Sequence, residues 1–131
     1  MSPSKHPYCL VLCKEGPYDS YGLYNVYFVN LSDAEVRAVR ITSRGYCSGD
    51  DELIQTSEGV KHLGAIAAGG HAVVETTDEG AFDFAIGYSA AVDTADGTAT
   101  MSFSVDKYLP AYTPPDAETP MGKPGWVIEA R

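Results

Sequence analysis

The alternation of apolar and polar side chains at every second position constrains this chain more than any other feature. Residues 82–88, FDFAIGY, and residues 98–105, TATMSFSV, both show it, and the turn sequence DTADG (93–97) separates them. A period of two is typical of strands with one face on a core, so we expect these segments to form a β-hairpin. Its buried residues are predicted to be Phe82, Phe84, Ile86, Met101 and Phe103, with Thr98, Thr100 and Ser102 facing water.

Other segments extend the β pattern along the chain. YCLVLCK (8–14) is apolar on both faces, as in a central strand, and LYNVYFVNL (23–31) is rich in aromatic and β-branched residues. A turn at Ser32-Asp33 leads into VRAVRITSR (36–44), and a Gly-Gly turn divides LGAIAAGGHAVVETT (63–77). The only helix candidate is one turn in DDELIQ (50–55). The sequence therefore predicts an all-β, immunoglobulin-like antiparallel β-sandwich of about seven to eight strands.

The last part of the chain has a different composition. Five of the eight prolines fall within residues 110–124. Because proline cannot donate to a sheet ladder, we expect a sandwich domain over residues 1–108 and an extended Pro-rich arm over residues 109–131. The apolar triplet Trp126-Val127-Ile128 is predicted to dock, either as an added edge strand on its own sandwich or on a neighbouring subunit. Docking on its own sandwich is favoured because a local contact avoids the entropy of association.

Net charge and cysteine content bound the partners and the compartment. The formal charge is −9, and the only basic cluster is Arg37, Arg40 and Arg44. This excludes a nucleic-acid partner, which would require a basic face. No apolar run is long enough for a signal peptide or a membrane span, and three cysteines fit a reducing compartment. We expect a cytoplasmic protein without a membrane partner.

The segment GYCSG (45–49) has the G-x-nucleophile-x-G spacing of a hydrolase elbow, with cysteine at the nucleophile position. An elbow needs a strand that turns sharply into a helix, and the neighbouring acids would raise the thiol pKa rather than lower it. We interpret the segment as a glycine-bounded loop after a strand, and the chain as not an enzyme. The alternative is a small Cys-dependent hydrolase using Cys47 with His62 or His71.

No metal or cofactor site is predicted. Cys9 and Cys13 lie four residues apart on one strand, too far to share an ion, and are interpreted as core cysteines. The acidic runs GDDE (49–52), TDEG (77–80) and DTADG do not have EF-hand spacing. A second alternative is a calcium- or carbohydrate-binding module built from these loops and the tyrosines.

Several stretches together show a resemblance: YNVYFVNLSD, VRAVRITSRGY, TSEGVKHLGAIAAGGHAVVE, FDFAIGYS and GKPGWVIEA. They resemble a family of small bacterial proteins of unknown function, some of which carry the label phenylalanyl-tRNA synthetase α subunit. The resemblance implies a compact cytoplasmic domain and provides no functional residues. A class II synthetase needs a large catalytic domain and a tRNA surface, for which this chain is too short and too acidic.

The hypothesis that follows is a non-catalytic binding or assembly module. Its partner is expected to be a protein, either another chain or a second copy joined through an edge strand or the C-terminal arm. Tyrosine beside glycine and serine forms adaptable recognition surfaces, and arginine on a sheet face can bind anions. The candidate binding residues are Tyr18, Tyr21, Arg40 and Arg44.

Overall fold

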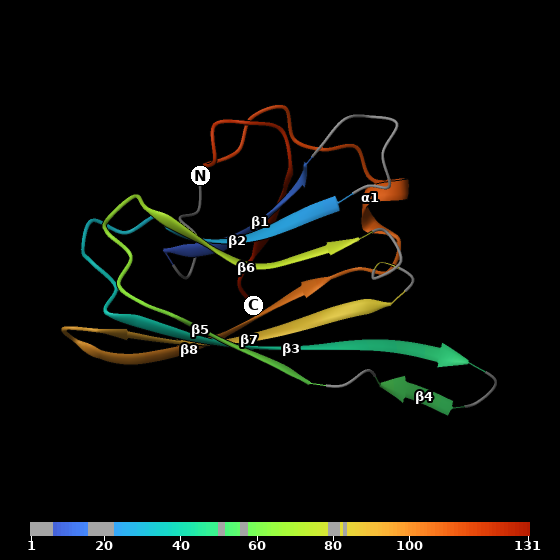
Figure 1. Cartoon of the computed structure of the whole chain (residues 1–131), viewed down its shortest axis with the longest axis horizontal. Coiled ribbons are helices and arrows are strands. Elements are labelled where there is room, and N and C mark those ends of the chain that lie inside the picture. The colour runs from blue at the N-terminus through green and yellow to red at the C-terminus, as the bar shows by residue number, and fades with distance from the viewer. Residues whose placement is uncertain (1–6, 16–22, 50–51, 56–57, 79–81, 83) are drawn as a thin grey trace.

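The computed structural model describes residues 7–15, 23–49, 52–55, 58–78, 82 and 84–131. In these residues, two antiparallel sheets pack face to face (Figure 1), which confirms the predicted all-β sandwich. One sheet has the strand order β6-β2-β1-β9, and the other has the order β4-β3-β7-β8, with β5 also paired to β3. The elements are β1 (Tyr8–Glu15), β2 (Leu23–Asn30), β3 (Ala38–Gly49), β4 (Glu52–Gln55), β5 (Gly59–Leu63), β6 (His71–Asp78), β7 (Ala85–Thr94), β8 (Gly97–Val105), α1 (Leu109–Tyr112) and β9 (Trp126–Glu129).

The hairpin of β7 and β8 follows the predicted alternation. Their register is continuous from Ile86↔Val105 to Thr94↔Gly97, and Gly97 has the positive φ of 119° that the turn needs. Phe82, Ile86, Met101 and Phe103 are buried in one core cluster, while Thr98, Thr100 and Ser102 are exposed. Phe84 is only half-buried, because β7 begins at Ala85 and Phe84 lies in the bend before it.

The main core lies between the sheets, and one polar contact crosses it. Tyr88 of β7 is 2% exposed, and its hydroxyl donates a hydrogen bond of 2.6 Å to a carboxylate oxygen of Glu75 on β6. Burial raises the pKa of Tyr88 well above its usual value, and the neighbouring Glu75 carboxylate adds to this effect. The hydroxyl therefore remains protonated and joins the two sheets as a donor.

The segment GYCSG is strand, so its interpretation as a loop was wrong. Residues Gly45–Gly49 complete β3, which extends past its last pair with β7 at Tyr46 and continues against β4. In the backbone register of this ladder, Cys47 pairs with Ile54. The DDELIQ segment was expected to form a helical turn, but its residues Glu52–Gln55 form β4. Strand pairing satisfies the backbone here, which a short polar helical turn at the surface would do poorly.

Asn30, at the end of β2, directs the chain from one sheet to the other. Its side chain is fully buried, and its amide nitrogen donates to the carbonyls of Ala34, Ile66 and Ala67. Its carbonyl oxygen accepts from the backbone and hydroxyl of Ser32. The turn after Ser32 therefore leads into β3 of the facing sheet rather than into a neighbour of β2.

The Pro-rich arm contains a short helix, α1, although no regular element was expected in residues 109–125. Pro110 lies in the first turn of α1, where a missing N–H has no helical acceptor to lose, so proline starts this helix instead of breaking it. At the end of the arm, β9 pairs antiparallel with β1 from Trp126↔Leu12 to Glu129↔Cys9. The triplet 126–128 thus docks on its own sandwich, and β1 is a central strand as predicted.

Between α1 and β9, the arm crosses above the outer face of β1 and β2 (Figure 1). A second apolar cluster lies beneath it. Gly125 packs so closely on β1 that a Cβ atom there would lie 2.6 Å from the Leu12 carbonyl oxygen. The cluster consists of Cys9, Val11, Cys13, Tyr27 and Val29, covered by Met121 and Val127.

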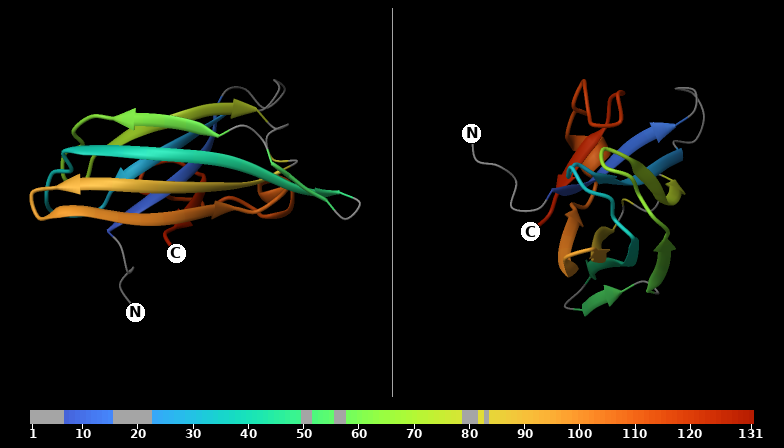
Figure 2. Two further views of the ribbon diagram at one scale, coloured as in Figure 1. Left: turned by 90° about the horizontal axis from the view of Figure 1, so that it is seen from below. Right: turned by 90° about the vertical axis from the view of Figure 1, so that its left-hand side faces the viewer.

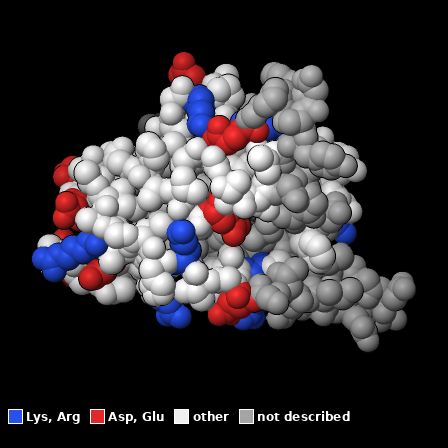
Figure 3. Space-filling model, in the orientation of Figure 1, with Lys and Arg blue, Asp and Glu red and all other residues white. Residues whose placement is uncertain are grey.

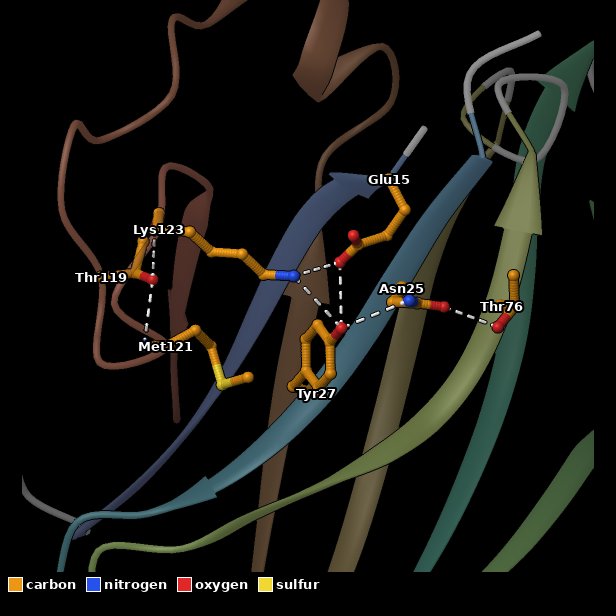
Figure 4. A network of polar contacts seen from close by, with 7 residues as sticks. All are labelled: Glu15, Asn25, Tyr27, Thr76, Thr119, Met121 and Lys123. Atoms are coloured by element: carbon orange, nitrogen blue, oxygen red, sulfur yellow. Dashed lines mark hydrogen bonds and ion pairs between the residues drawn. The ribbon is translucent and has the colours of Figure 1, made fainter. Parts of the chain in front are cut away.

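Polar contacts fasten the arm at the end of β1 (Figure 4). Lys123 donates to Glu15 over 2.5 Å, and the Tyr27 hydroxyl donates to the same carboxylate oxygen over 2.9 Å. Asn25 and Thr76 extend the chain of hydrogen bonds onto β2 and β6. The hydrogen bond from Lys123 lowers the pKa of Glu15, against an opposing effect of partial burial.

Glu15→Gln is expected to lower the free energy of unfolding by no more than about 1 kcal/mol at pH 7, because both charged groups are partly exposed. Since the folded-state pKa of Glu15 is lowered, its stabilising contribution is present above the unfolded pKa of about 4.3 and is lost as pH falls through the folded value. Urea unfolding of both proteins from neutral to acidic pH checks this. Glu118→Gln, in the exposed part of the arm, is the control. A wild-type advantage over Glu15→Gln that persists in acid would contradict the assignment.

Candidate binding face on the five-stranded sheet

Small side chains and hydroxyl-bearing side chains lie on the outer face of strands β3, β7 and β8. Alternation along β7 places Tyr88 and Ala90 in the core, so Gly87, Ser89 and Ala91 lie on the outer face. These small residues form a low central strip between β8, which presents Thr100 and Ser102, and β3, which presents the longer Arg40. The left view of Figure 2 looks onto this face, with β7 between β3 and β8.

A shallow hollow of about 440 Å³ lies over this strip. Its hydroxyl groups come from three strands, and arginines from distant parts of the sequence, Arg40 on β3 and Arg131 after β9, complete its lining. The backbone N–H of Arg131 donates to the Ser102 carbonyl over 2.8 Å, which fixes the end of the chain beside β8. The side chains over the hollow are Arg40, Thr42, Ser89, Ala91, Thr100, Ser102 and Arg131.

Two arginine side chains line the hollow of this acidic protein. Its lining contains two arginines and no acidic residue. Neither guanidinium makes an ion pair with any residue in the described part of the chain. A neighbouring hollow of about 280 Å³ contains Arg44, which is already paired with Glu58. Lys and Arg are interspersed with Asp and Glu on the side of the molecule seen in Figure 3.

The structure brings together some of the predicted binding residues. Arg40 and Arg44 lie four residues apart on the same face of β3, each over one of the two hollows. Tyr18 and Tyr21 lie outside the described residues. Tyr24, from the same tyrosine-rich stretch, is buried in the core of β2, with its ring 4.9 Å from that of Phe82.

The residues of the hydrolase alternative are separated in the fold. His62 pairs with Arg40 on β3, and Cys47 lies seven residues further along that strand, a rise of about 23 Å. His71 begins β6 in the other sheet, at the end of the sandwich away from β4 in Figure 1, and its ring packs edge-on against Tyr27. The backbone of Gly45–Gly49 runs straight as a strand instead of making the sharp strand-to-helix turn of an elbow.

The calcium and carbohydrate alternatives depend on loop acids and tyrosines. Within the described residues, no three His, Cys, Asp or Glu side chains are grouped to hold a metal ion. Asp50, Asp51, Glu79 and Gly80 lie outside that part of the chain. Tyr108 and Tyr112 form an exposed aromatic pair beside α1, with their rings edge-to-face at 89°. Coplanar rings would offer a sugar a flat platform, and this pair does not.

Sequence reasoning missed Thr42, Ser89, Thr100, Ser102 and Arg131 as members of the hollow. Three of them are the polar members of the period-two pattern, which predicts only that they face water. Arg131 gave no signal, because its place beside Ser102 depends on where β9 docks. Among the described thiols, Cys9 and Cys13 are free and buried, and burial raises the pKa of Cys9 to about 11, with a further increase from Glu129.

The chain matches no family model, no curated protein and no solved structure. Its resemblance to the small bacterial family stays a prediction, and its function is inferred from its own residues. In the part of the chain that the structure describes, no helix is long and apolar enough to cross a bilayer.

Proposed function

We propose that this chain is a non-catalytic binding module that holds an acidic segment of a protein partner over the outer face of β3, β7 and β8. The observation that carries the proposal is the hollow in which Arg40 and Arg131 lie over a floor of hydroxyl groups without an acidic residue. Guanidinium groups bind carboxylates with paired, charge-assisted hydrogen bonds. Serine and threonine hydroxyls can donate to further carboxylate or carbonyl oxygens.

A peptide fits this face better than a small molecule does. The hollow is shallow and continues along the strip of Gly87 and Ser89 into the one beside Arg44. Small-molecule sites are usually enclosed and mostly apolar, and this one is open and lined by hydroxyls. An elongated open groove can accept an extended backbone, and arginine is among the residues that contribute most to protein interfaces.

The net charge of −9 opposes an acidic partner at long range but not at contact. At physiological salt the Debye length is about 8 Å, so charges elsewhere on the surface are largely screened from a ligand in the hollow. We therefore expect slow association at low salt and specificity from the two arginines. This differs from electrostatic steering, in which low salt accelerates binding.

Peptide selection from a random displayed library, with the full chain immobilised, tests this function. The selected peptides are expected to be enriched in Asp and Glu. Arg40→Ala should weaken their binding roughly tenfold or more, because a hydrogen bond to a charged group contributes about 1.5–3 kcal/mol. Arg37→Ala is the matched control, since Arg37 is exposed nearby but does not line the hollow. Selected peptides without acidic enrichment, or equal affinity for the two variants, would refute the proposal.

We extend the proposal to topology and compartment. In an immunoglobulin domain, strands A, B and E share one sheet and strands C, F and G share the other. The neighbouring strands β1, β2 and β6 in one sheet, and β3, β7 and β8 in the other, support an immunoglobulin-like arrangement of this kind. The two unpaired thiols on β1 support residence in a reducing, cytoplasmic environment.

A further inference from the structure

The sheet edges of the sandwich differ in how well they are protected against pairing. Charges, prolines, bulges and short length discourage pairing at exposed edges. β6 carries Glu75 and Asp78 and a register shift opposite Val26 and Tyr27. β4, β5 and β9 have four, five and four residues. β8 has nine residues, GTATMSFSV, with no charge and no proline, and its register with β7 is unbroken.

The backbone groups of β8 that face its open side can be identified. In an antiparallel ladder, the N–H and C=O of one residue point to the same side, and successive residues alternate. The Ser102 carbonyl accepts from Arg131, outside the β7 ladder, so Ser102 faces the open side. Thr98, Thr100 and Ser104 share its parity. Across the described residues, the Arg131 contact is the single backbone hydrogen bond on this side of β8. Figure 2 shows β8 at the margin of the sheet.

Two copies of β8 can be aligned antiparallel, with Met101 of one copy opposite Met101 of the other. In that register, Thr100 faces Ser102 of a second copy and Thr98 faces its Ser104, so all four outward-facing residues exchange backbone hydrogen bonds. Threonine and serine pairs on the outer face add side-chain hydrogen bonds. On the inner face, the small Ala99 lies beside the large Phe103 of the other copy. The strand itself brings no charged side chain to the contact.

We propose that β8 is a self-association edge, which pairs antiparallel with β8 of a second copy about a twofold axis at Met101. The pairing makes one continuous sheet from two molecules and replaces the single Arg131–Ser102 hydrogen bond. It places the outer faces of the two molecules side by side on that sheet. The proposal concerns an edge and does not depend on what the hollow binds.

Sedimentation velocity of the full chain from about 10 µM to about 1 mM tests the proposal, because such a short edge contact should be weak. The wild type is expected to become dimeric as concentration rises. Thr100→Pro should weaken dimerisation roughly tenfold or more: it removes an outward N–H that the β7 ladder does not use. Thr100→Ala is the matched control and should dimerise as the wild type does. Thr100→Lys should also weaken dimerisation, by adding a charge to the edge without changing the backbone.

Cross-linking tests the register. In a Cys47→Ser background, Met101→Cys should form an intermolecular disulfide on mild oxidation, because facing residues at the axis have Cα atoms about 4.5 Å apart. Ala99→Cys is the control and should not, since its own copies lie four positions apart across the axis. A monomer at every concentration, or a dimer that Thr100→Pro and Thr100→Lys leave equally tight, would overturn the proposal. Failure of Met101→Cys to cross-link in a dimer sensitive to Thr100→Lys would overturn the axis at Met101.

Discussion

Phe103→Ala is expected to lower the free energy of unfolding by about 3–5 kcal/mol, through lost burial and the cavity left behind. Phe103 is 1% exposed, and it pairs with Tyr88 across β7 and β8 at the centre of the core between the sheets. The surrounding strands belong to ladders on both sheets, so they cannot collapse far into the space. Urea unfolding followed by circular dichroism measures the change.

Phe84→Ala is the matched control for this substitution. The residue type is the same, but Phe84 is only half-buried in the bend before β7, so the loss should be at least about 1 kcal/mol smaller. Equal losses at the two positions would mean that Phe84 contributes fully to the core. A loss below about 1 kcal/mol at Phe103 would mean that the hairpin register is inverted, because a one-residue slip moves every side chain to the other face.

Trp126→Ala is expected to lower the free energy of unfolding by a similar amount, about 3–5 kcal/mol. Trp126 is 8% exposed, its ring lies 6.2 Å from that of Tyr24, and its indole N–H donates to the Thr113 carbonyl over 2.8 Å. Trp126 therefore fixes both ends of the arm. Its buried ring anchors β9 in the core, and its hydrogen bond to Thr113 holds the residue that follows α1 beside β9. Its loss should loosen the arm as well as the core.

Trp126→Phe separates these contributions. It keeps an aromatic ring in the core, so its free energy of unfolding should fall less than that of Trp126→Ala. It removes the indole donor, so the hydrogen bond to Thr113, which contributes about 0.5–1.5 kcal/mol, should still be lost. Alkylation of Cys9 and Cys13, mapped by mass spectrometry under native conditions, reports on the arm, which covers both thiols. Alkylation should be faster in Trp126→Ala than in the wild type. Unchanged alkylation together with unchanged stability would show that the arm docks without this residue.

Local patterns of the sequence predicted the strands well where one face is buried. The alternation in β8, the apolar run of β1 and the Gly-Gly turn before β6 all correspond to observed elements. Predictions of secondary structure were wrong where they depended on single residue types, glycine and proline, instead of on the alternation of apolar and polar side chains. Glycines around Cys47 indicated a loop, but pairing with β4 keeps this segment extended. Proline indicated an arm without regular structure, but Pro110 occupies the one helical turn that tolerates it.

The candidate site was only partly visible for a related reason. Arg40 and Arg44 stood out because arginine is rare in this acidic chain. Ser89, Thr100 and Ser102 could be predicted to face water, but nothing in their own segments shows that three strands present them to one hollow. Arg131 joins them only because β9 adds to β1 and brings the end of the chain to β8.

The sequence by itself determined that the chain forms antiparallel strands with one apolar face, a tight hairpin at Gly97 and a long uncharged strand in β8. These properties depend on the period of the side chains and on backbone preferences within a few residues. Only the tertiary structure decided which strands share a sheet, that buried Asn30 turns the chain from one sheet to the other, and that the arm covers the outer face of β1. Those outcomes depend on burial and hydrogen bonding between segments far apart in the chain, and the free energy of such contacts appears only when the segments have already met.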